Sequence, residues 1–260
     1  MKKLLVIMMI ALAVTTSCKN TGTKATDESK TDSITVQDTA PLNALSAQET
    51  TDGVILLFDG KSTDQWRGYN KTDFPKGWNI EDNAIHCIGS GKGEAGQGGD
   101  IITKEKYKNF ELTLEWKISE GGNSGIFYLA QEIPGMEIYK SAPEMQVLDN
   151  AKHPDAKLGV DGNRQAGSLY DLISAKPQNA KPAGEWNTVK IMVFKGTVVH
   201  YQNGEKVLEY HLWTDDWKKM CANSKFKDFK NFVDPATEGF IGLQDHGDDV
   251  WYRNIKIKNL

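Results

Sequence analysis

The chain has 260 residues and a formal net charge of −4 at pH 7, because 35 acidic residues outnumber 31 lysines and arginines. A protein that binds nucleic acid is expected to carry a basic face, so this acidic composition argues against DNA or RNA as a partner. After the N-terminal segments described next, about two hundred residues remain, a length compatible with one large all-β domain.

The first eighteen residues have the pattern of an export signal. Two lysines precede an apolar run over 4–14, and small residues follow it up to Cys18, which is the order of a secretory signal peptide. A small residue directly before Cys18 resembles a bacterial lipoprotein processing site, although Thr15 stands where leucine is more usual. We therefore predict a signal peptide over 1–17 and a lipidated Cys18 that anchors the exported protein to the cell envelope, on the periplasmic side of the outer membrane. Ordinary signal cleavage, with Cys18 incidental, is the alternative.

Residues 19–48 are rich in threonine, serine, aspartate, lysine and alanine, with almost no large apolar side chains. Such a segment cannot bury enough apolar surface to order itself, so we expect a disordered tether over 18–50 and a single domain over 51–260. Within that domain, the spacing of Cys87 and Cys221 fits no zinc pattern. A disulfide between them and two buried free thiols are both compatible with an exported protein.

The domain shows the period-two alternation of half-buried β-strands. Residues 110–118 are the clearest example, because their apolar side chains alternate strictly with polar ones. Only 215–231 has a helical pattern, and we interpret it as a short helical insertion on a connection. Strands and helices do not alternate, so we predict an all-β fold of antiparallel strands stacked as a β-sandwich or jelly roll. Strands are expected at 54–58, 78–81, 84–88, 110–118, 124–130, 144–148, 188–193, 197–202, 240–246 and 250–258.

Two of these expected strands carry chemically capable side chains on one face only. Their apolar residues fall on the opposite face, so one face builds core and the other is available for a site. The alternative is that the polar side chains merely face water, as on any half-buried antiparallel strand. The polar residues are Glu144 and Gln146 in one strand, and Gln244 and His246 in the other.

The strand residues do not supply the carboxylate pair that most glycosidases use. Glu144 and Asp149 are five positions apart, so in a regular strand they point to opposite faces and lie about 16 Å from each other. The two carboxyl groups of a glycosidase are about 5 to 9.5 Å apart. A two-carboxylate mechanism therefore requires a partner for Glu144 from another strand.

Six motifs run through the domain: LFDGKSTDQWRG, GNSGIFYL, PEMQVLDN, GSLYDL, GEWNTVKI and GFIGLQDHGDDVWYRNIKIKNL. In these motifs the chain resembles the bacterial 3-keto-disaccharide hydrolase family, also named for 3-keto-glucoside-1,2-lyase and 3-keto-2-hydroxy-glucal hydratase activities. The resemblance implies a concanavalin- or laminarinase-like sandwich whose concave face binds sugar. The site residues that it implicates are Asn123, Glu144, Gln146, Tyr170, Gln244, His246 and Arg253.

The resemblance also implies a particular way of breaking a glycosidic bond. In a glucoside oxidised at C3, the hydrogen on C2 is acidic because its removal gives an enolate, and the group on C1 is then able to leave. Hydration of the resulting glucal completes a net hydrolysis. We assign Glu144 and His246 as the catalytic acid and base, and Arg253 or a bound divalent metal ion as the stabiliser of the enolate. The residues assigned to substrate binding are Asn123, Gln146, Tyr170, Gln244 and Arg253.

Two alternatives stay open. A noncatalytic sugar-binding module on a lipid tether is the alternative function, because sandwich folds host both classes; Glu144 and His246 favour the enzyme, since a binding face needs aromatics and amides rather than titratable groups. Arg253 shares its expected face with Ile255 and Ile257, so it is also interpreted as a structural arginine near the sheet edge.

Overall fold

The structure is a computed structural model, which describes residues 40–93, 96 and 98–260. The predicted signal peptide, the lipidation site at Cys18 and the tether as far as residue 39 lie outside the described residues. Within the described part, no helix is long and apolar enough to cross a membrane. Cys87 and Cys221 are both buried and free, so they do not form a disulfide with each other.

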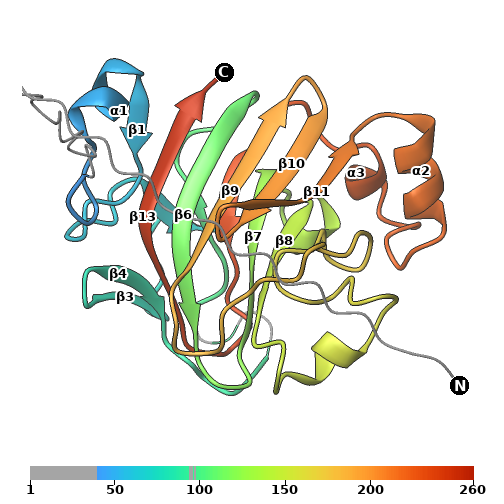
Figure 1. The fold of residues 1–260 in the computed structure, drawn as a ribbon, viewed down its shortest axis with the longest axis horizontal. Helices are drawn as coiled ribbons and strands as arrows, with labels where there is room; N and C mark the ends of the chain where they lie inside the picture. The colour runs from blue at the N-terminus through green and yellow to red at the C-terminus, as the bar shows by residue number, and fades with distance from the viewer. Residues whose placement is uncertain (1–39, 94–95, 97) are drawn as a thin grey trace, which may run out of the picture. The chain divides into compact units, whose positions relative to one another are not determined.

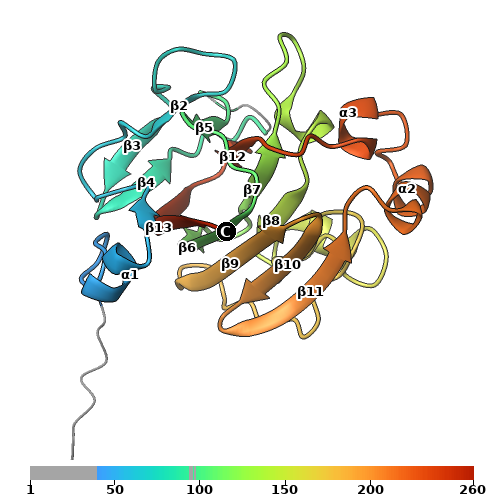
Figure 2. The same ribbon diagram turned by 90° about the horizontal axis from the view of Figure 1, so that it is seen from above.

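Two antiparallel sheets stack on each other, which confirms the predicted all-β sandwich (Figure 1, Figure 2). The eight-stranded sheet has the order β11-β10-β9-β6-β13-β4-β3, with β1 paired to β13 beside this path, and the five-stranded sheet has the order β2-β5-β12-β7-β8. The strands are β1 (Val54–Leu56), β2 (Trp66–Gly68), β3 (Trp78–Glu81), β4 (Ala84–Cys87), β5 (Ile101–Thr103), β6 (Phe110–Ile118), β7 (Asn123–Ala130), β8 (Glu144–Leu148), β9 (Asn187–Phe194), β10 (Thr197–Gln202), β11 (Glu205–His211), β12 (Phe240–Leu243) and β13 (Val250–Asn259).

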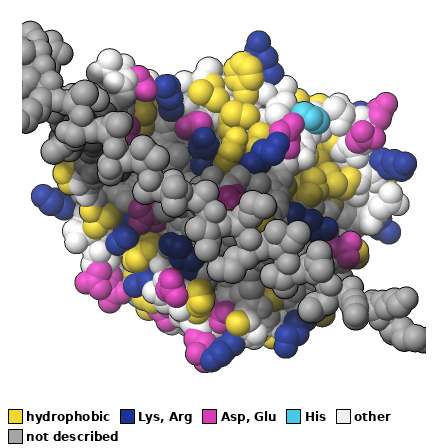
Figure 3. Space-filling model, in the orientation of Figure 1, with side chains coloured by type: hydrophobic (Ala, Val, Ile, Leu, Met, Phe, Trp, Pro, Cys, Tyr) yellow, Lys and Arg dark blue, Asp and Glu magenta, His cyan; other side chains and the backbone are white. Residues whose placement is uncertain are grey.

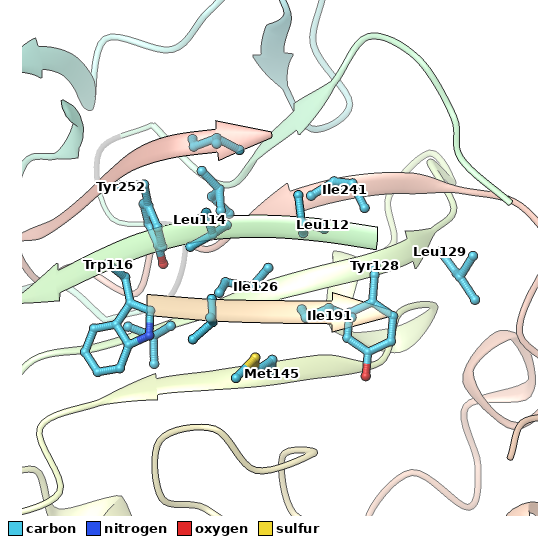
Figure 4. Close-up of a cluster of buried hydrophobic side chains, with 14 of the residues drawn as sticks. Leu112, Leu114, Trp116, Ile126, Tyr128, Leu129, Met145, Ile191, Ile241 and Tyr252 are labelled. Atoms are coloured by element: carbon cyan, nitrogen blue, oxygen red, sulfur yellow. The ribbon is translucent and has the colours of Figure 1, made fainter. Parts of the chain in front are cut away.

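The core lies between the two sheets, and each sheet contributes the apolar face of its strands (Figure 4). In β6, for example, buried and half-buried positions alternate along the whole strand, as the period of two requires. Polar groups join the two sheets across the core: the Tyr128 hydroxyl lies 2.8 Å from His200 Nε2 and 2.7 Å from the Tyr210 hydroxyl, and the Ser124 hydroxyl lies 2.8 Å from that of Tyr252. The core residues labelled in Figure 4 are Leu112, Leu114, Trp116, Ile191 and Tyr252 from the eight-stranded sheet, and Ile126, Tyr128, Leu129, Met145 and Ile241 from the five-stranded sheet.

The outer face of the five-stranded sheet is divided into an apolar end and a polar end. A small apolar cluster that includes Phe127, Ala130 and Phe240 covers one end. The short 3₁₀ helix η1 (Ile138–Lys140) closes this cluster, packing so near to β12 that a Cβ on Gly242 would lie 2.8 Å from a methyl group of Ile138. The opposite ends of β7 and β8, and the segment after β12, carry the polar side chains.

The ordered domain begins earlier than predicted. Helix α1 (Ala47–Thr51) starts with a capping box, in which the Ser46 hydroxyl accepts from the Glu49 main-chain N–H and the Glu49 carboxylate accepts from the Ser46 N–H. Before the helix, the buried Asn43 side chain accepts from the Asn254 N–H at 2.8 Å. The polar composition of this segment predicts a tether because it lacks large apolar side chains. The segment is ordered instead by hydrogen bonds from an amide side chain and a helix cap, which composition does not reveal.

Helices α2 (Asp215–Ala222) and α3 (Lys230–Val233) form the predicted helical insertion, between β11 and β12. The insertion is not one continuous helix. The Ser224 hydroxyl donates to the last turn of α2 at 2.8 Å and accepts from the Phe226 N–H at 3.1 Å, a local turn that competes with the helix. The connection over 223–229 is therefore free to follow a different path.

The remaining differences from the predicted elements are short strands and strand ends. The sequence does not predict β2 and β5, which have three residues each and are too short to show an alternation. It also leaves β11 unassigned after the turn at Asn203-Gly204. Strand β12 ends at Leu243 rather than at residue 246, so two of the predicted site residues lie just beyond a strand.

Candidate active site

A pocket of about 270 Å³ lies on the outer face of the five-stranded sheet, at its polar end. Its floor comes from β7, β8 and the segment after β12, and its wall comes from the loop that carries Tyr170, from η1 and from the connection between α2 and α3. A larger, open groove of about 1020 Å³ beside β2 contains none of the predicted site residues. The residues that line the pocket are Asn123, Tyr139, Glu144, Gln146, Tyr170, Lys225, Phe226, Phe229, Gln244 and His246.

The register of β7 and β8 places Glu144 on the floor of the pocket. Gly125 pairs with Gln146, and Glu144 pairs with Phe127. Because Gly125 has no side chain, the Glu144 carboxylate lies directly over the β7 backbone: a Cβ on Gly125 would lie 2.0 Å from Oε1 of Glu144. Gly125, the last residue of the GNSG motif, therefore makes room for the carboxylate.

Gln146 links Glu144 to the neighbouring strand. With its amide nitrogen directed toward Glu144, Gln146 donates to Oε1 of Glu144 at 3.1 Å and to the Ser124 main-chain oxygen at 3.0 Å. In the opposite orientation of the amide, the same nitrogen donates instead to Oδ1 of Asn123 at 3.3 Å. Both glutamine and carboxylate are almost completely buried, so the amide fixes the carboxylate in one orientation.

Gln244 is held rigidly through its backbone and has an unused acceptor on its side chain. Its main-chain N–H donates to the Gly125 oxygen at 3.0 Å, and its main-chain oxygen accepts from the Ser124 hydroxyl at 2.7 Å. Its side chain is 7% exposed, and Oε1 has no hydrogen-bond partner in the described part of the chain. A buried acceptor without a partner costs free energy, which a ligand hydroxyl in the pocket would recover.

His246 stands at the rim of the pocket, in a turn organised by its neighbour Asp245. The buried Asp245 carboxylate accepts from the main-chain N–H groups of Gly98, Gly99 and Gly247, at 3.2, 2.9 and 3.0 Å. The half-buried His246 ring therefore projects from a fixed backbone.

A second histidine faces the first. The His153 ring is perpendicular to the His246 ring, with 6.3 Å between their centroids. Burial, together with the nearby His246, lowers the pKa of His153. Its Nδ1 accepts from the Asp155 N–H at 3.1 Å, so the neutral ring carries its proton on Nε2.

The wall on the loop side is an ionic network behind Tyr170. The Tyr170 hydroxyl donates to Asp155 at 2.8 Å, and Arg164 joins Asp155, 2.7 Å away, to Asp171. Burial is the largest cause that raises the pKa of Tyr170, and the hydrogen bond to Asp155 adds to it. Tyr170 is therefore a neutral, fixed donor whose ring, not its hydroxyl, is the part that contributes to the wall.

The wall on the insertion side is aromatic and carries one ammonium group. Phe226 stacks on Phe232 with 4.0 Å between centroids, and Phe229 lies 6.1 Å from Tyr139 of η1. Between these rings and Tyr170, the Lys225 ammonium lies 4.0 Å from the centroid of the Tyr170 ring. A polar floor bounded by aromatic rings is the composition expected of a small-molecule site.

Comparison with known proteins identifies the family. Residues 53–258 match the family described as the 3-keto-alpha-glucoside-1,2-lyase-like domain. The chain belongs to this family. A 3-keto-disaccharide hydrolase of Bacteroides thetaiotaomicron is 56% identical over 241 residues, which are 85% of this chain and 83% of that protein.

Two solved structures have folds similar to that of this member of the 3-keto-alpha-glucoside-1,2-lyase-like family. A candidate glycosyl hydrolase of Parabacteroides distasonis is 33% identical, with a TM-score of 0.76 over 85% of this chain and the whole of that one. A second candidate glycosyl hydrolase from the same organism is 28% identical, with a TM-score of 0.61 over 80% of this chain and 99% of that one. The sandwich is therefore shared across relatives of moderate identity.

Arg253 does not line the pocket of this family member, which corrects its assignment to substrate. It lies on the outer face of the eight-stranded sheet, where its Nε donates to Glu115 at 2.7 Å and its guanidinium lies 3.8 Å from the centroid of the Trp186 ring. The register of β13 shifts after Arg253, and Asn254 has a φ of +51°. This bulge reverses the alternation, so Arg253 does not share the face of Ile255.

Basic and acidic side chains are interspersed on the visible surface in Figure 3.

The pocket brings together every other residue that the sequence assigns to the site, and it adds residues that the sequence does not assign. Lys225, Phe226 and Phe229 belong to the insertion, and Tyr139 belongs to η1. A cluster of aromatics among lysines in the insertion is the one signal in the sequence that marks them. In the ranges that the structure describes, no three His, Cys, Asp or Glu side chains form a group able to hold a metal ion, so no ligands are assigned to the divalent ion.

Proposed function

We propose that this chain is a hydrolase of 3-keto-disaccharides and related 3-keto-glucosides, and that it acts by elimination followed by hydration. The observation that carries the proposal is the pocket itself, in which Glu144 and His246 occur with the unpartnered acceptor of Gln244 on one sheet face. The relative named 3-keto-disaccharide hydrolase supports the choice of substrate.

The first half of the reaction is an elimination. A base removes the proton from C2, the electron pair forms an enolate with the C3 carbonyl, and the C1–O bond then breaks as a double bond forms between C1 and C2. The departing oxygen takes a proton from an acid. Glu144 and His246 provide one carboxyl and one imidazole group for these two proton transfers, and both are side chains that general acid–base catalysis commonly uses.

The second half is a hydration of the glucal. Water adds to C1, which is conjugated with the C3 carbonyl, and C2 takes a proton back. The water proton that is lost and the proton that C2 gains balance, so the sum of both halves is hydrolysis of the glycosidic bond. The same acid and base serve both halves with their protonation reversed, and a new pair of residues is not needed.

The other pocket residues suit a sugar. The Gln244 side chain lines the pocket and has an acceptor without a partner among the described residues, and the Asn123 and Gln146 amides extend the polar floor. The rings of Tyr139, Phe226 and Phe229 provide apolar surface for a sugar face or an aglycone. These groups bind and orient the substrate, whereas Glu144 and His246 move protons.

The test is turnover of an authentic 3-keto-glucoside by the domain over 40–260, with release of the aglycone followed in real time. Glu144→Gln and His246→Ala, each confirmed to be folded, are expected to lower kcat by about 10²- to 10⁴-fold. Reaction in D₂O is expected to place deuterium on C2 of the product. Full turnover by both variants would refute the assigned roles, and binding of the substrate without turnover by the wild type would favour the sugar-binding module. A parallel series with a chelator tests the need for a divalent ion.

Export and lipid anchoring are a separate proposal, based on residues 1–18. Labelling of cells with a lipid precursor is expected to mark the full-length chain and to leave a Cys18→Ala variant unmarked. A protein that is exported but unlabelled would support ordinary signal cleavage instead. The catalytic proposal does not depend on this outcome.

A further inference from the structure

We infer that Lys225 is a catalytic residue that places its ammonium group at the C3 oxygen of the substrate and stabilises the enolate. The inference rests on the proposed function, because an enolate forms only if C2 loses its proton. No catalytic role follows for Lys225 from the sequence motifs of the family, since it lies in the insertion between β11 and β12 rather than in any of them.

The chemistry requires a positive group or a set of donors at C3. When the C2 proton leaves, negative charge accumulates on the C3 oxygen, and a fixed donor at that position lowers the barrier more than it stabilises the neutral ketone. From the sequence, this role is assigned to Arg253 or to a bound divalent metal ion. The Arg253 guanidinium is bound to Glu115 and stacked on Trp186 on a different face of the sandwich. No residue of the chain first assigned to the site therefore supplies a positive group at C3.

Lys225 is the pocket residue that fits this role. Of the residues that line the pocket, it alone is a lysine or an arginine. Its ammonium lies over two aromatic rings, 4.0 Å from the centroid of Tyr170 and 5.2 Å from that of Phe226. In the described part of the chain it has no ion-pair partner within 4.0 Å, so its hydrogen-bonding capacity is available to a ligand.

The charged groups around Lys225 act on it in opposite directions. Lys225 is exposed as a residue, but neighbouring groups partly desolvate its ammonium; this desolvation lowers its pKa, and the positive charge of Arg164 does the same, whereas Asp171, Glu144 and Asp155 raise it. The carboxylates lie at a distance where they attract the ammonium without binding it. This balance keeps the group in the pocket and leaves its protons for an oxygen with a developing negative charge.

The local fold explains how a lysine in a surface connection comes to line the wall of the pocket. Helix α2 ends at Ala222, and the turn at Ser224 that follows it changes the direction of the chain just before Lys225. Phe226 then enters the core of the insertion by stacking on Phe232, and Phe232 stacks on Trp217 with 5.6 Å between centroids. A flexible side chain on a fixed backbone is thus limited to the space above Tyr170.

The experiment compares Lys225→Met with Lys227→Met, a matched control two residues along the same connection. Both lysines are exposed, but only Lys225 lines the pocket. Lys225→Met is expected to lower kcat about 10²- to 10³-fold, the usual effect of losing one oxyanion donor, with KM changed by less than about fivefold and an unchanged melting temperature. Lys227→Met is expected to keep wild-type kinetics. Lys225→Ala is expected to regain at least about tenfold in kcat with added ethylammonium, which a merely structural role would not allow.

The outcomes separate this inference from the proposed function. If the wild type does not turn over the 3-keto-glucoside, the proposed function fails and the inference fails with it. If the wild type is active and Lys225→Met keeps kcat within about threefold, the inference alone is overturned. A folded, inactive Lys225→Ala variant that ethylammonium does not rescue also counts against a direct role at the C3 oxygen.

Discussion

Replacement of Gly125 by alanine is expected to disable the pocket without unfolding the protein. The added Cβ would lie 2.0 Å from Oε1 of Glu144 and 2.6 Å from its carboxyl carbon, whereas ordinary contact begins at 3.4 Å. The carboxylate must therefore move by about 1.4 Å, and a misplacement of about 1 Å is able to cost about 100-fold in rate. The added Cβ would also lie 2.8 Å from Cγ of Glu144, so the buried side chain must rotate as a whole, and the stability cost is expected to be about 1 to 3 kcal/mol, the usual range for overpacking.

The assay is a double-mutant cycle in kcat, with Gly125→Ala, Glu144→Gln and the two changes combined. If alanine acts by displacing the carboxylate, the combined variant loses no more than Glu144→Gln alone, because residues in one unit are not additive. Thermal unfolding of each variant checks that the fold is intact. The reasoning is refuted if Gly125→Ala keeps nearly full turnover, or if the two losses multiply.

Three further predictions concern Gln244, Arg253 and His200. Gln244→Leu removes an unpartnered buried oxygen, so the melting temperature is expected to stay the same or rise while KM rises about tenfold; a fall in stability with unchanged KM would contradict this. Arg253→Ala is expected to lower the free energy of unfolding by about 1 kcal/mol through the lost Glu115 and Trp186 contacts and to leave kcat unchanged, so a large loss of turnover would restore Arg253 to the site. Burial lowers the pKa of His200 from 6.5 to about 4, so the unfolded chain binds a proton that the folded chain does not, and stability falls by up to about 3 kcal/mol as pH drops through that window. Urea unfolding of wild type and His200→Asn checks this, since the variant should lose that part of the pH dependence.

The sandwich and the floor of the pocket follow from the sequence because they depend on local periodicity. Strict alternation over 110–118 predicts β6 to the residue, and the same period puts Glu144 and Gln146 on the face opposite to Met145 and Val147. The alternation of apolar and polar residues does not show which residues of neighbouring strands pair with each other. That Gly125 lies beneath Glu144 depends on the register of β7 with β8, which is set by the packing of the whole sheet.

The errors at Arg253 and Lys225 have the same physical origin. A bulge adds a residue to one strand without changing its composition, so the left-handed Asn254 is invisible in an alternating pattern and Arg253 is assigned to the wrong face. In the insertion, a helical pattern extends past Ser224, although a hydroxyl that bonds to its own backbone ends the helix there. The path of the following connection, and thus Lys225, depends on tertiary aromatic contacts.

The separation between the floor and the insertion has a consequence for changes in chain length. Much of the floor belongs to β7 and β8, which are paired strands of a hydrogen-bonded sheet, and a change of length within them would shift their register. The aromatic wall belongs to a connection that carries its own small aromatic core, from Trp217 to Phe226, and joins an edge strand of one sheet to an inner strand of the other (Figure 2). If the proposed function holds, changes of chain length over 212–239 would alter the aromatic wall without shifting the register of β7 and β8, the strand pair that positions Glu144 and Gln146.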